Sequence, residues 1–185
     1  MKNYFFYFNQ ILITIYSHIW MNFYDLEVIY EPFVLEKNKR YIIIANHIYR
    51  KDPFIIGPFF PMLDYFKITP YRFLTAEKYM YNFLLRLSLH WCGCFFNIDG
   101  KETLKTAQKF LNRGETIFVF PEGKMNKTGK FEKHIKLGIG AIYLERNNPD
   151  LYLIPVKIEY LSKRKIKITY KKPFTRGVRS KCREA

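Results

Sequence analysis

The sequence predicts an α/β fold, in which helices flank a mostly parallel central sheet and an N-terminal amphipathic, membrane-associated helix precedes it. Apolar runs typical of strands buried on both faces alternate with helical segments of about 10–15 residues. A chain of 185 residues suits one such domain. We therefore expect the amphipathic helix over 1–25, the α/β domain over 26–175 and a basic tail over 176–185.

Strands and helices follow from the spacing of apolar residues. The runs 41–45 and 116–120 predict buried strands, and Pro58 and Pro61 are expected to break a short helix over 52–63. The other segments with strand-like patterns are 26–35, 72–76, 94–98, 151–159 and 166–170. The other segments with helical spacing are 78–91, 102–112 and 136–146.

Residues 3–24 contain no Asp, Glu, Lys or Arg. On a helical wheel, apolar and aromatic residues occupy about half the circumference, and polar residues such as Gln10, Thr14 and Ser17 occupy the other side. Packing on the domain surface and a single membrane span are both open alternatives. We favour an interfacial helix whose aromatic side lies among lipid headgroups.

The chain is strongly basic, with 31 Lys and Arg against 16 Asp and Glu, and aromatic residues make up 19% of it. This composition favours an anionic partner, either a membrane surface or a nucleic acid. The sequence has no recognised nucleic-acid motif, so we expect no nucleic acid partner. Three cysteines without a second close pair predict reduced thiols and no zinc site.

A candidate catalytic pair follows the first buried strand. Asn46 and His47 come directly after 41–45, and Asp52 lies five residues beyond the histidine. In open α/β sheets, functional side chains gather at the carboxyl ends of strands. The Asp52 carboxylate could hold one ring nitrogen of His47, which would leave the other nitrogen to accept a proton from a hydroxyl. The spacing alone also fits an incidental loop histidine.

A second motif follows the other buried strand. Phe120, Pro121, Glu122, Gly123 and Lys124 form a tight turn that supplies backbone amides, a carboxylate and a cation. If the two strands are parallel, this turn ends at the same edge of the sheet as His47. From the residues alone, it is either a binding turn or plain turn chemistry.

Together the two motifs resemble the glycerolipid acyltransferase family, which is typified by 1-acylglycerol-3-phosphate acyltransferase. Its N-H-x4-D block stands here as Asn46-His47 with Asp52, and its F-P-E-G block stands as residues 120–123. An apolar strand with a proline (153–156) and a lysine before small residues (136–141) fit the remaining pattern. The resemblance covers about residues 30–175 and identifies this segment as an acyltransferase domain.

Two family arginines are missing. The second block of the family ends in an arginine that meets the acceptor phosphate, and Asp99 stands here instead. The arginine after F-P-E-G is replaced by Met125 in the run Lys124-Met125-Asn126. Lys124 could bind phosphate as a point charge, helped by Lys127 or Lys130.

The resemblance implies fatty acyl transfer from acyl-CoA or acyl-carrier protein to a hydroxyl of a lysophospholipid, foremost 1-acylglycerol-3-phosphate. His47 would be the general base, and Asp52 would orient it. The implied substrate-binding residues are Asn46, Phe120, Pro121, Glu122, Gly123 and Lys124. We expect no metal and no cofactor, a lysolipid acceptor among membrane phospholipids, and a position on the cytoplasmic face of a membrane.

The missing arginines leave the acceptor open. The same chemistry could act on another lysolipid, glycerol-3-phosphate, or a lipid alcohol or amine. A non-catalytic member of the family that only binds lipid is a further alternative.

Overall fold

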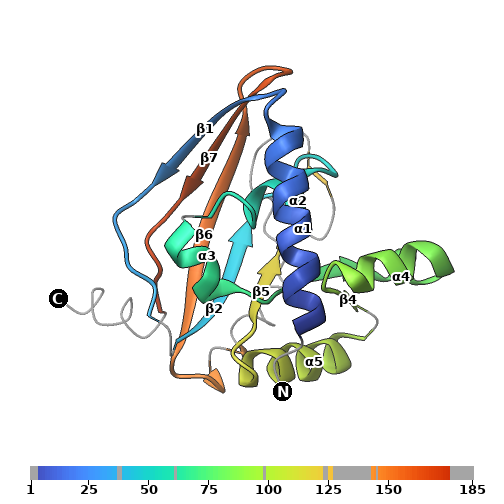
Figure 1. Ribbon diagram of the computed structural model, residues 1–185. Coiled ribbons are helices and arrows are strands. Elements are labelled where there is room, and N and C mark those ends of the chain that lie inside the picture. The colour runs from blue at the N-terminus through green and yellow to red at the C-terminus, as the bar shows by residue number, and fades with distance from the viewer. Residues whose placement is uncertain are drawn as a thin grey trace.

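The computed structural model describes residues 4–36, 39–60, 62–97, 99–122, 125–126, 143–144 and 146–175 (Figure 1). Within these residues, seven strands form one sheet in the order β1-β7-β6-β2-β5-β3-β4. The strands are β1 (Asp25–Tyr30), β2 (Arg40–Ala45), β3 (Tyr71–Ala76), β4 (Cys94–Asn97), β5 (Thr116–Val119), β6 (Leu151–Tyr160) and β7 (Lys165–Tyr170).

The sheet is mostly parallel, as predicted. Strands β6, β2, β5, β3 and β4 run in one direction and pair in parallel. The hairpin between β6 and β7 reverses the chain, so β7 pairs antiparallel with β6, and β1 then pairs in parallel with β7. The antiparallel edge follows from the short connection between β6 and β7, since parallel strands need a longer crossover.

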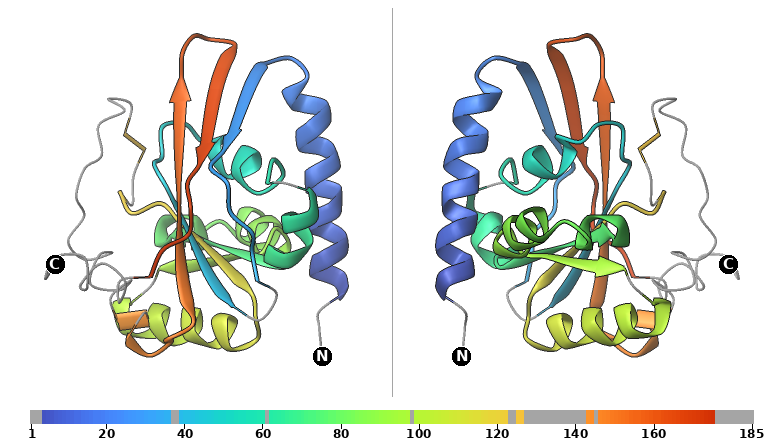
Figure 2. Two further views of the ribbon diagram at one scale, coloured as in Figure 1. Left: turned by 90° about the vertical axis from the view of Figure 1, so that its left-hand side faces the viewer. Right: turned by 90° about the vertical axis from the view of Figure 1, so that its right-hand side faces the viewer.

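Helices cover both faces of the sheet (Figure 2). The helices α2 (Asp52–Ile56) and α3 (Met62–Ile68) pack on one face, and α1 (Tyr4–Met21) runs along the outside of this layer. The helix α5 (Gly100–Asn112) packs on the other face. A 3-10 turn, η1 (Glu77–Met80), and α4 (Phe83–Trp91) connect β3 to β4.

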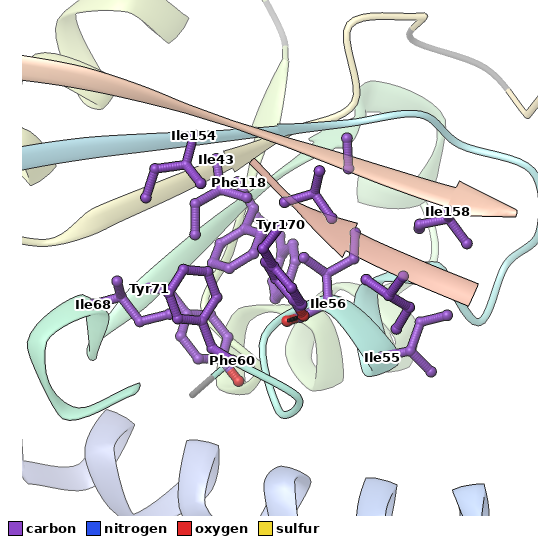
Figure 3. Packing of buried hydrophobic residues seen from close by; sticks show 14 of the residues in the cluster. Ile43, Ile55, Ile56, Phe60, Ile68, Tyr71, Phe118, Ile154, Ile158 and Tyr170 are labelled. Atoms are coloured by element: carbon purple, nitrogen blue, oxygen red, sulfur yellow. Dashed lines mark hydrogen bonds between the residues drawn. The ribbon is translucent and has the colours of Figure 1, made fainter. Parts of the chain in front are cut away.

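Alternating side chains of the strands build two cores. Ile43 of β2 and Phe118 of β5 belong to the core beneath α2, whereas Ile42 and Ile117 belong to the core beneath α5. Figure 3 shows the first core, in which Tyr170 lies near Ile56. The Tyr170 hydroxyl donates a hydrogen bond to the Ile56 carbonyl at 2.5 Å, so this buried polar group has a partner.

The predicted break in the segment 52–63 is confirmed, since it forms α2 and the beginning of α3 with Gly57 and Pro58 between them. The other predicted helix is divided in a way that the sequence analysis did not predict. The segment 78–91 forms η1 and α4, and Asn82 caps α4 by accepting a hydrogen bond from the Leu85 amide at 3.0 Å. Most of the predicted helix 136–146, and the basic tail 176–185, lie outside the described residues.

The helix α1 docks on the domain through its polar side. Gln10 is fully buried, and its amide donates to the Tyr71 carbonyl at 2.6 Å and accepts from the Tyr71 amide at 3.2 Å. Ser17 is also fully buried, and the Tyr7 hydroxyl donates to the Thr69 carbonyl at 2.7 Å. The polar face found on the helical wheel is therefore the face that contacts the domain.

The apolar side of α1 points away from the domain. Its large hydrophobic side chains are between 42% and 73% exposed: Phe8, Ile11, Leu12, Ile15, Tyr16, Ile19 and, just beyond the helix, Phe23. We call this set the α1 stripe. Among the described residues, no helix combines the length and the apolar character of a membrane span.

We predict that Gln10→Leu lowers the free energy of unfolding by about 1–3 kcal/mol. The substitution fills the buried position with an apolar side chain of similar size but removes two hydrogen bonds to the Tyr71 backbone. Urea unfolding followed by circular dichroism measures the change. Asn22→Leu, at an exposed position near the end of α1, serves as the control. Equal stability of the two variants would contradict the docking role of Gln10.

Candidate active site

The loop that carries His47 begins with a side chain that extends the sheet. Asn46 is buried, and its side-chain amide donates to the Ile158 carbonyl at 2.9 Å and accepts from the Ile158 amide at 2.7 Å. The backbone pairing of β2 with β6 ends at Ala45 and Val156. Asn46 thus continues the pairing by one step while its own backbone turns into the loop.

The structure brings the predicted catalytic pair together. Nδ1 of His47 lies 3.0 Å from Oδ2 of Asp52, so Nδ1 carries a hydrogen and donates it to the carboxylate. The His47 side chain is 19% exposed, whereas the Asp52 side chain is fully buried. The remaining ring nitrogen, Nε2, is therefore the one left to exchange a proton with a substrate hydroxyl.

The buried carboxylate of Asp52 has four hydrogen-bond donors. Besides His47, the backbone amides of Ile48 and Tyr49 donate to Oδ2 at 2.6 and 2.8 Å. The Tyr160 hydroxyl, at the end of β6, donates to Oδ1 at 2.6 Å. Each oxygen of the carboxylate is thus held, and this fixes the direction in which Asp52 faces the imidazole.

Tyr160 is a residue of the site that the sequence analysis missed. Burial, followed by the negative charge of Asp52, raises the pKa of Tyr160 well above its usual value, so the hydroxyl stays protonated and remains a donor. It lies at the carboxyl end of a strand parallel to β2. Applying the strand-end rule to this third strand would have drawn attention to it.

An ammonium group lies beside the pair. Nζ of Lys51 stands 3.9 Å from the ring centre of Tyr24, 4.9 Å from that of Tyr160 and 5.9 Å from that of Tyr49. Such cation–π contacts are attractive and orient the rings. Because Tyr24 follows α1, these contacts also connect the end of that helix to the loop that bears His47 and Asp52.

The second motif lies against the first. The predicted parallel pairing of their strands is confirmed, with Ile44 of β2 opposite Val119 of β5. The Phe120 ring stacks on the His47 ring with centroids 4.3 Å apart. The backbone amide of Asn126, a residue to which the sequence analysis assigned no role, donates to the His47 carbonyl at 2.6 Å.

The structure places the other predicted binding residues unequally. Pro121 follows Phe120 and is half-buried, and Glu122 is 2% exposed. Gly123 and Lys124 lie outside the described residues. Asp99, which replaces a family arginine, lies exposed directly before α5. Glu122 thus places a buried carboxylate within the second motif itself.

The described residues contain no group of three or more His, Cys, Asp or Glu side chains arranged as metal ligands. Burial raises the pKa of Cys94 to about 12, which keeps this thiol protonated and unreactive as a nucleophile. The site therefore consists of a histidine with one oriented nitrogen, a buried carboxylate bound to that nitrogen and an aromatic ring against the face of the imidazole. It suits proton transfer to and from a hydroxyl or thiol.

Comparisons with known proteins identify the family and a structure with a similar fold. The sequence profile of the acyltransferase family matches residues 21–159. The structure is similar to the crystal structure of the 1-acyl-sn-glycerophosphate (LPA) acyltransferase PlsC from Thermotoga maritima, with a TM-score of 0.61 and 16% identity. The match covers 89% of this chain and 68% of that chain. The matched range spans most of the chain and includes residues 46–52 and 120–123, and the chain belongs to the acyltransferase family.

Proposed function

We propose that the chain transfers a fatty acyl group from acyl-CoA or acyl-carrier protein to the hydroxyl of a lysophospholipid, foremost 1-acylglycerol-3-phosphate. The observation that carries this proposal is the His47–Asp52 pair, seated at the carboxyl edge of the sheet against Phe120. Family membership supports acyl transfer, and the lysophosphatidate acceptor rests on the motif resemblance.

In the proposed reaction, Nε2 of His47 accepts the proton of the acceptor hydroxyl as its oxygen attacks the thioester carbonyl. A C–O bond forms, the carbonyl π electrons move to oxygen, and the tetrahedral intermediate then expels the thiolate. The imidazolium returns the proton to the departing sulfur. Asp52 stabilises the imidazolium and holds Nδ1 in place, so no acyl-enzyme and no cofactor are needed.

Two further groups support this reaction. Backbone amides at the turn that begins with Phe120, or a nearby lysine, would stabilise the oxyanion of the intermediate. For the acceptor phosphate, Arg50 is exposed in the loop between His47 and Asp52. We propose that Arg50, together with Lys124, takes the place of the missing family arginines.

A different acceptor remains the second candidate. It is favoured by one observation, namely that Asp99 and Met125 stand where the family carries arginines. If Asp99 lies where the resemblance implies that the acceptor phosphate binds, its carboxylate would disfavour a phosphomonoester by like-charge repulsion. The chemistry at His47 would be the same, and only the acceptor would change.

We propose that the enzyme works on a membrane surface facing the cytoplasm, where it meets its lysolipid acceptor. The α1 stripe is apolar and exposed, and the polar side that would otherwise face water is occupied by the domain. Lipid headgroups and upper acyl chains match such a surface. The excess of basic residues adds attraction to anionic lipids.

We predict that His47→Ala lowers kcat by about 10²–10⁴-fold, because the general base is lost while the fold is retained. Labelled acyl-CoA and acyl-carrier protein would be supplied in parallel to purified, detergent-solubilised protein, with a panel of acceptors. Transfer to lysophosphatidate by the wild type supports the first candidate, and transfer only to acceptors without a phosphomonoester supports the second. A His47→Ala variant that keeps more than about a tenth of the activity would contradict the assignment.

We predict that Tyr160→Phe lowers kcat about tenfold and leaves KM unchanged, because Asp52 loses the donor to Oδ1 but the substrate surface is preserved. In an Asp52→Asn background, the same substitution is expected to have little further effect. Steady-state kinetics on the four proteins of this double-mutant cycle measure the coupling.

Tyr170→Phe is the matched control for this cycle. It also removes a hydroxyl that donates a buried hydrogen bond, but the acceptor is the Ile56 carbonyl in the core. It should lower the free energy of unfolding without lowering kcat. Equal losses of kcat in Tyr160→Phe and Tyr170→Phe would show that the Tyr160 hydroxyl acts only on stability. Additive effects of Tyr160→Phe and Asp52→Asn on kcat would show that Tyr160 does not act through Asp52.

A further inference from the structure

The helix α4 is apolar and yet has no buried residue. It connects β3 to β4 and projects away from the body of the protein (Figure 1). The large hydrophobic side chains on it and before it are between 38% and 78% exposed: Tyr81, Phe83, Leu84, Leu85, Leu87 and Trp91. Exposure on this scale is unusual for a connection inside an α/β domain, where crossover helices normally pack on the sheet.

One face of α4 gathers most of these side chains. At 100° per residue, Phe83, Leu84, Leu87 and Trp91 fall within about a third of the circumference. We call these four residues the α4 face. Leu89 lies on the other side of the helix and packs against the core beneath α2. The helix is thus held by its inner side, and the α4 face is directed outward.

The charges on and beside α4 are mostly positive. Glu77, in η1, is bound by the Tyr81 hydroxyl at 2.7 Å before the helix begins. Residues 78–97 contain no Asp or Glu, whereas Lys78 and Arg86 are exposed. The Arg86 guanidinium lies 5.8 Å from the ring centre of Phe83, beside the apolar face rather than apart from it. Apolar and aromatic side chains bordered by cations complement the surface of a bilayer that contains anionic lipids.

The end of α4 adjoins α1. The Asn9 side-chain amide donates to the Trp91 carbonyl at 3.5 Å. On the helical wheel, Asn9 borders the α1 stripe next to Tyr16. The C-terminal end of α4, which carries Trp91, therefore lies beside α1 at the border of the α1 stripe.

We propose that α4 is a second membrane-contacting element, which inserts its α4 face into the same anionic bilayer surface as the α1 stripe. This inference rests on the proposed membrane location of α1 but involves a different segment of the chain. Two helices held at an angle to each other fix the orientation of the domain on the membrane, whereas one helix would allow rotation about its axis. The segment also leaves the sheet at the carboxyl end of β3, the edge at which His47 lies.

The chain contains two tryptophans, Trp20 in α1 and Trp91 in the α4 face, so fluorescence can report on α4 alone. Trp20→Phe leaves Trp91 as the reporter of α4. Tyr16→Trp combined with Trp20→Phe and Trp91→Phe places a single reporter in the α1 stripe. Both full-length proteins would be mixed with vesicles of phosphatidylcholine and phosphatidylglycerol that carry brominated acyl chains.

We predict that brominated lipid quenches both reporters to an extent that agrees within about twofold, because both side chains reach the acyl chains. Quenching of the α1 reporter without quenching of Trp91 would overturn the role of α4 and leave that of α1 intact. Quenching of neither reporter would instead remove the proposed membrane location itself. Acyl transfer measured in detergent would distinguish that result from a failure of the catalytic proposal.

A paired substitution tests the contribution of α4 to affinity. Phe83→Gln with Leu84→Gln removes apolar surface without changing charge and should weaken vesicle binding about tenfold or more. Val34→Gln is the matched control, because Val34 is 81% exposed but lies near β1, at the opposite edge of the sheet from β4. Equal binding by the paired variant and the control would overturn the proposal.

A second copy of the chain is the competing occupant of the α4 face. Sedimentation velocity without lipid would then show dimers that the paired variant loses, and Trp91 would be shielded from the brominated lipid. That combination would also overturn the proposal.

Discussion

The conformation of the loop that bears His47 depends on the carboxylate of Asp52. It is fully buried, and an ionised carboxylate in such a place is stable only if donors surround it. The backbone amides of Ile48 and Tyr49 shape the loop around one oxygen, and His47 shares that oxygen. The Tyr160 hydroxyl binds the other oxygen from a neighbouring strand. The same contacts that fold the loop therefore orient the imidazole, and stability and chemistry cannot be separated at this residue.

Parallel pairing determines where the two motifs meet. Because β2 and β5 run side by side in the same direction, residues that follow them leave the sheet at one edge. The backbone leaves the sheet at Asn46, and the Asn46 side chain takes over the hydrogen bonds to the Ile158 backbone. The Asn46 side chain is occupied by Ile158 and holds the loop that positions His47. Any effect of Asn46 on substrate binding would therefore act through the position of this loop.

The sequence predicted what depends on local pattern. Continuous apolar runs identified β2 and β5, and the direction of those strands followed from the α/β alternation. The antiparallel pairing of β7 and the role of Tyr160 did not follow, because both depend on which strands become neighbours in space. The helical wheel separated two faces of α1 correctly, but periodicity alone cannot tell which face is inward. That was decided by Gln10, whose amide matches the backbone groups of Tyr71.

The inward polar face of α1 has a physical consequence for the whole molecule. Apolar packing is non-directional and tolerates rotation of a helix, whereas the two hydrogen bonds of Gln10 fix one rotation about the helix axis. Because the polar side of α1 is held against the domain, the α1 stripe on the opposite side is directed outward. The Lys51 ammonium, packed on the Tyr24 ring at the end of the helix, connects this orientation to the loop of His47. A surface that receives the stripe consequently meets a fixed side of the domain, and the loop of His47 keeps a constant position relative to that side.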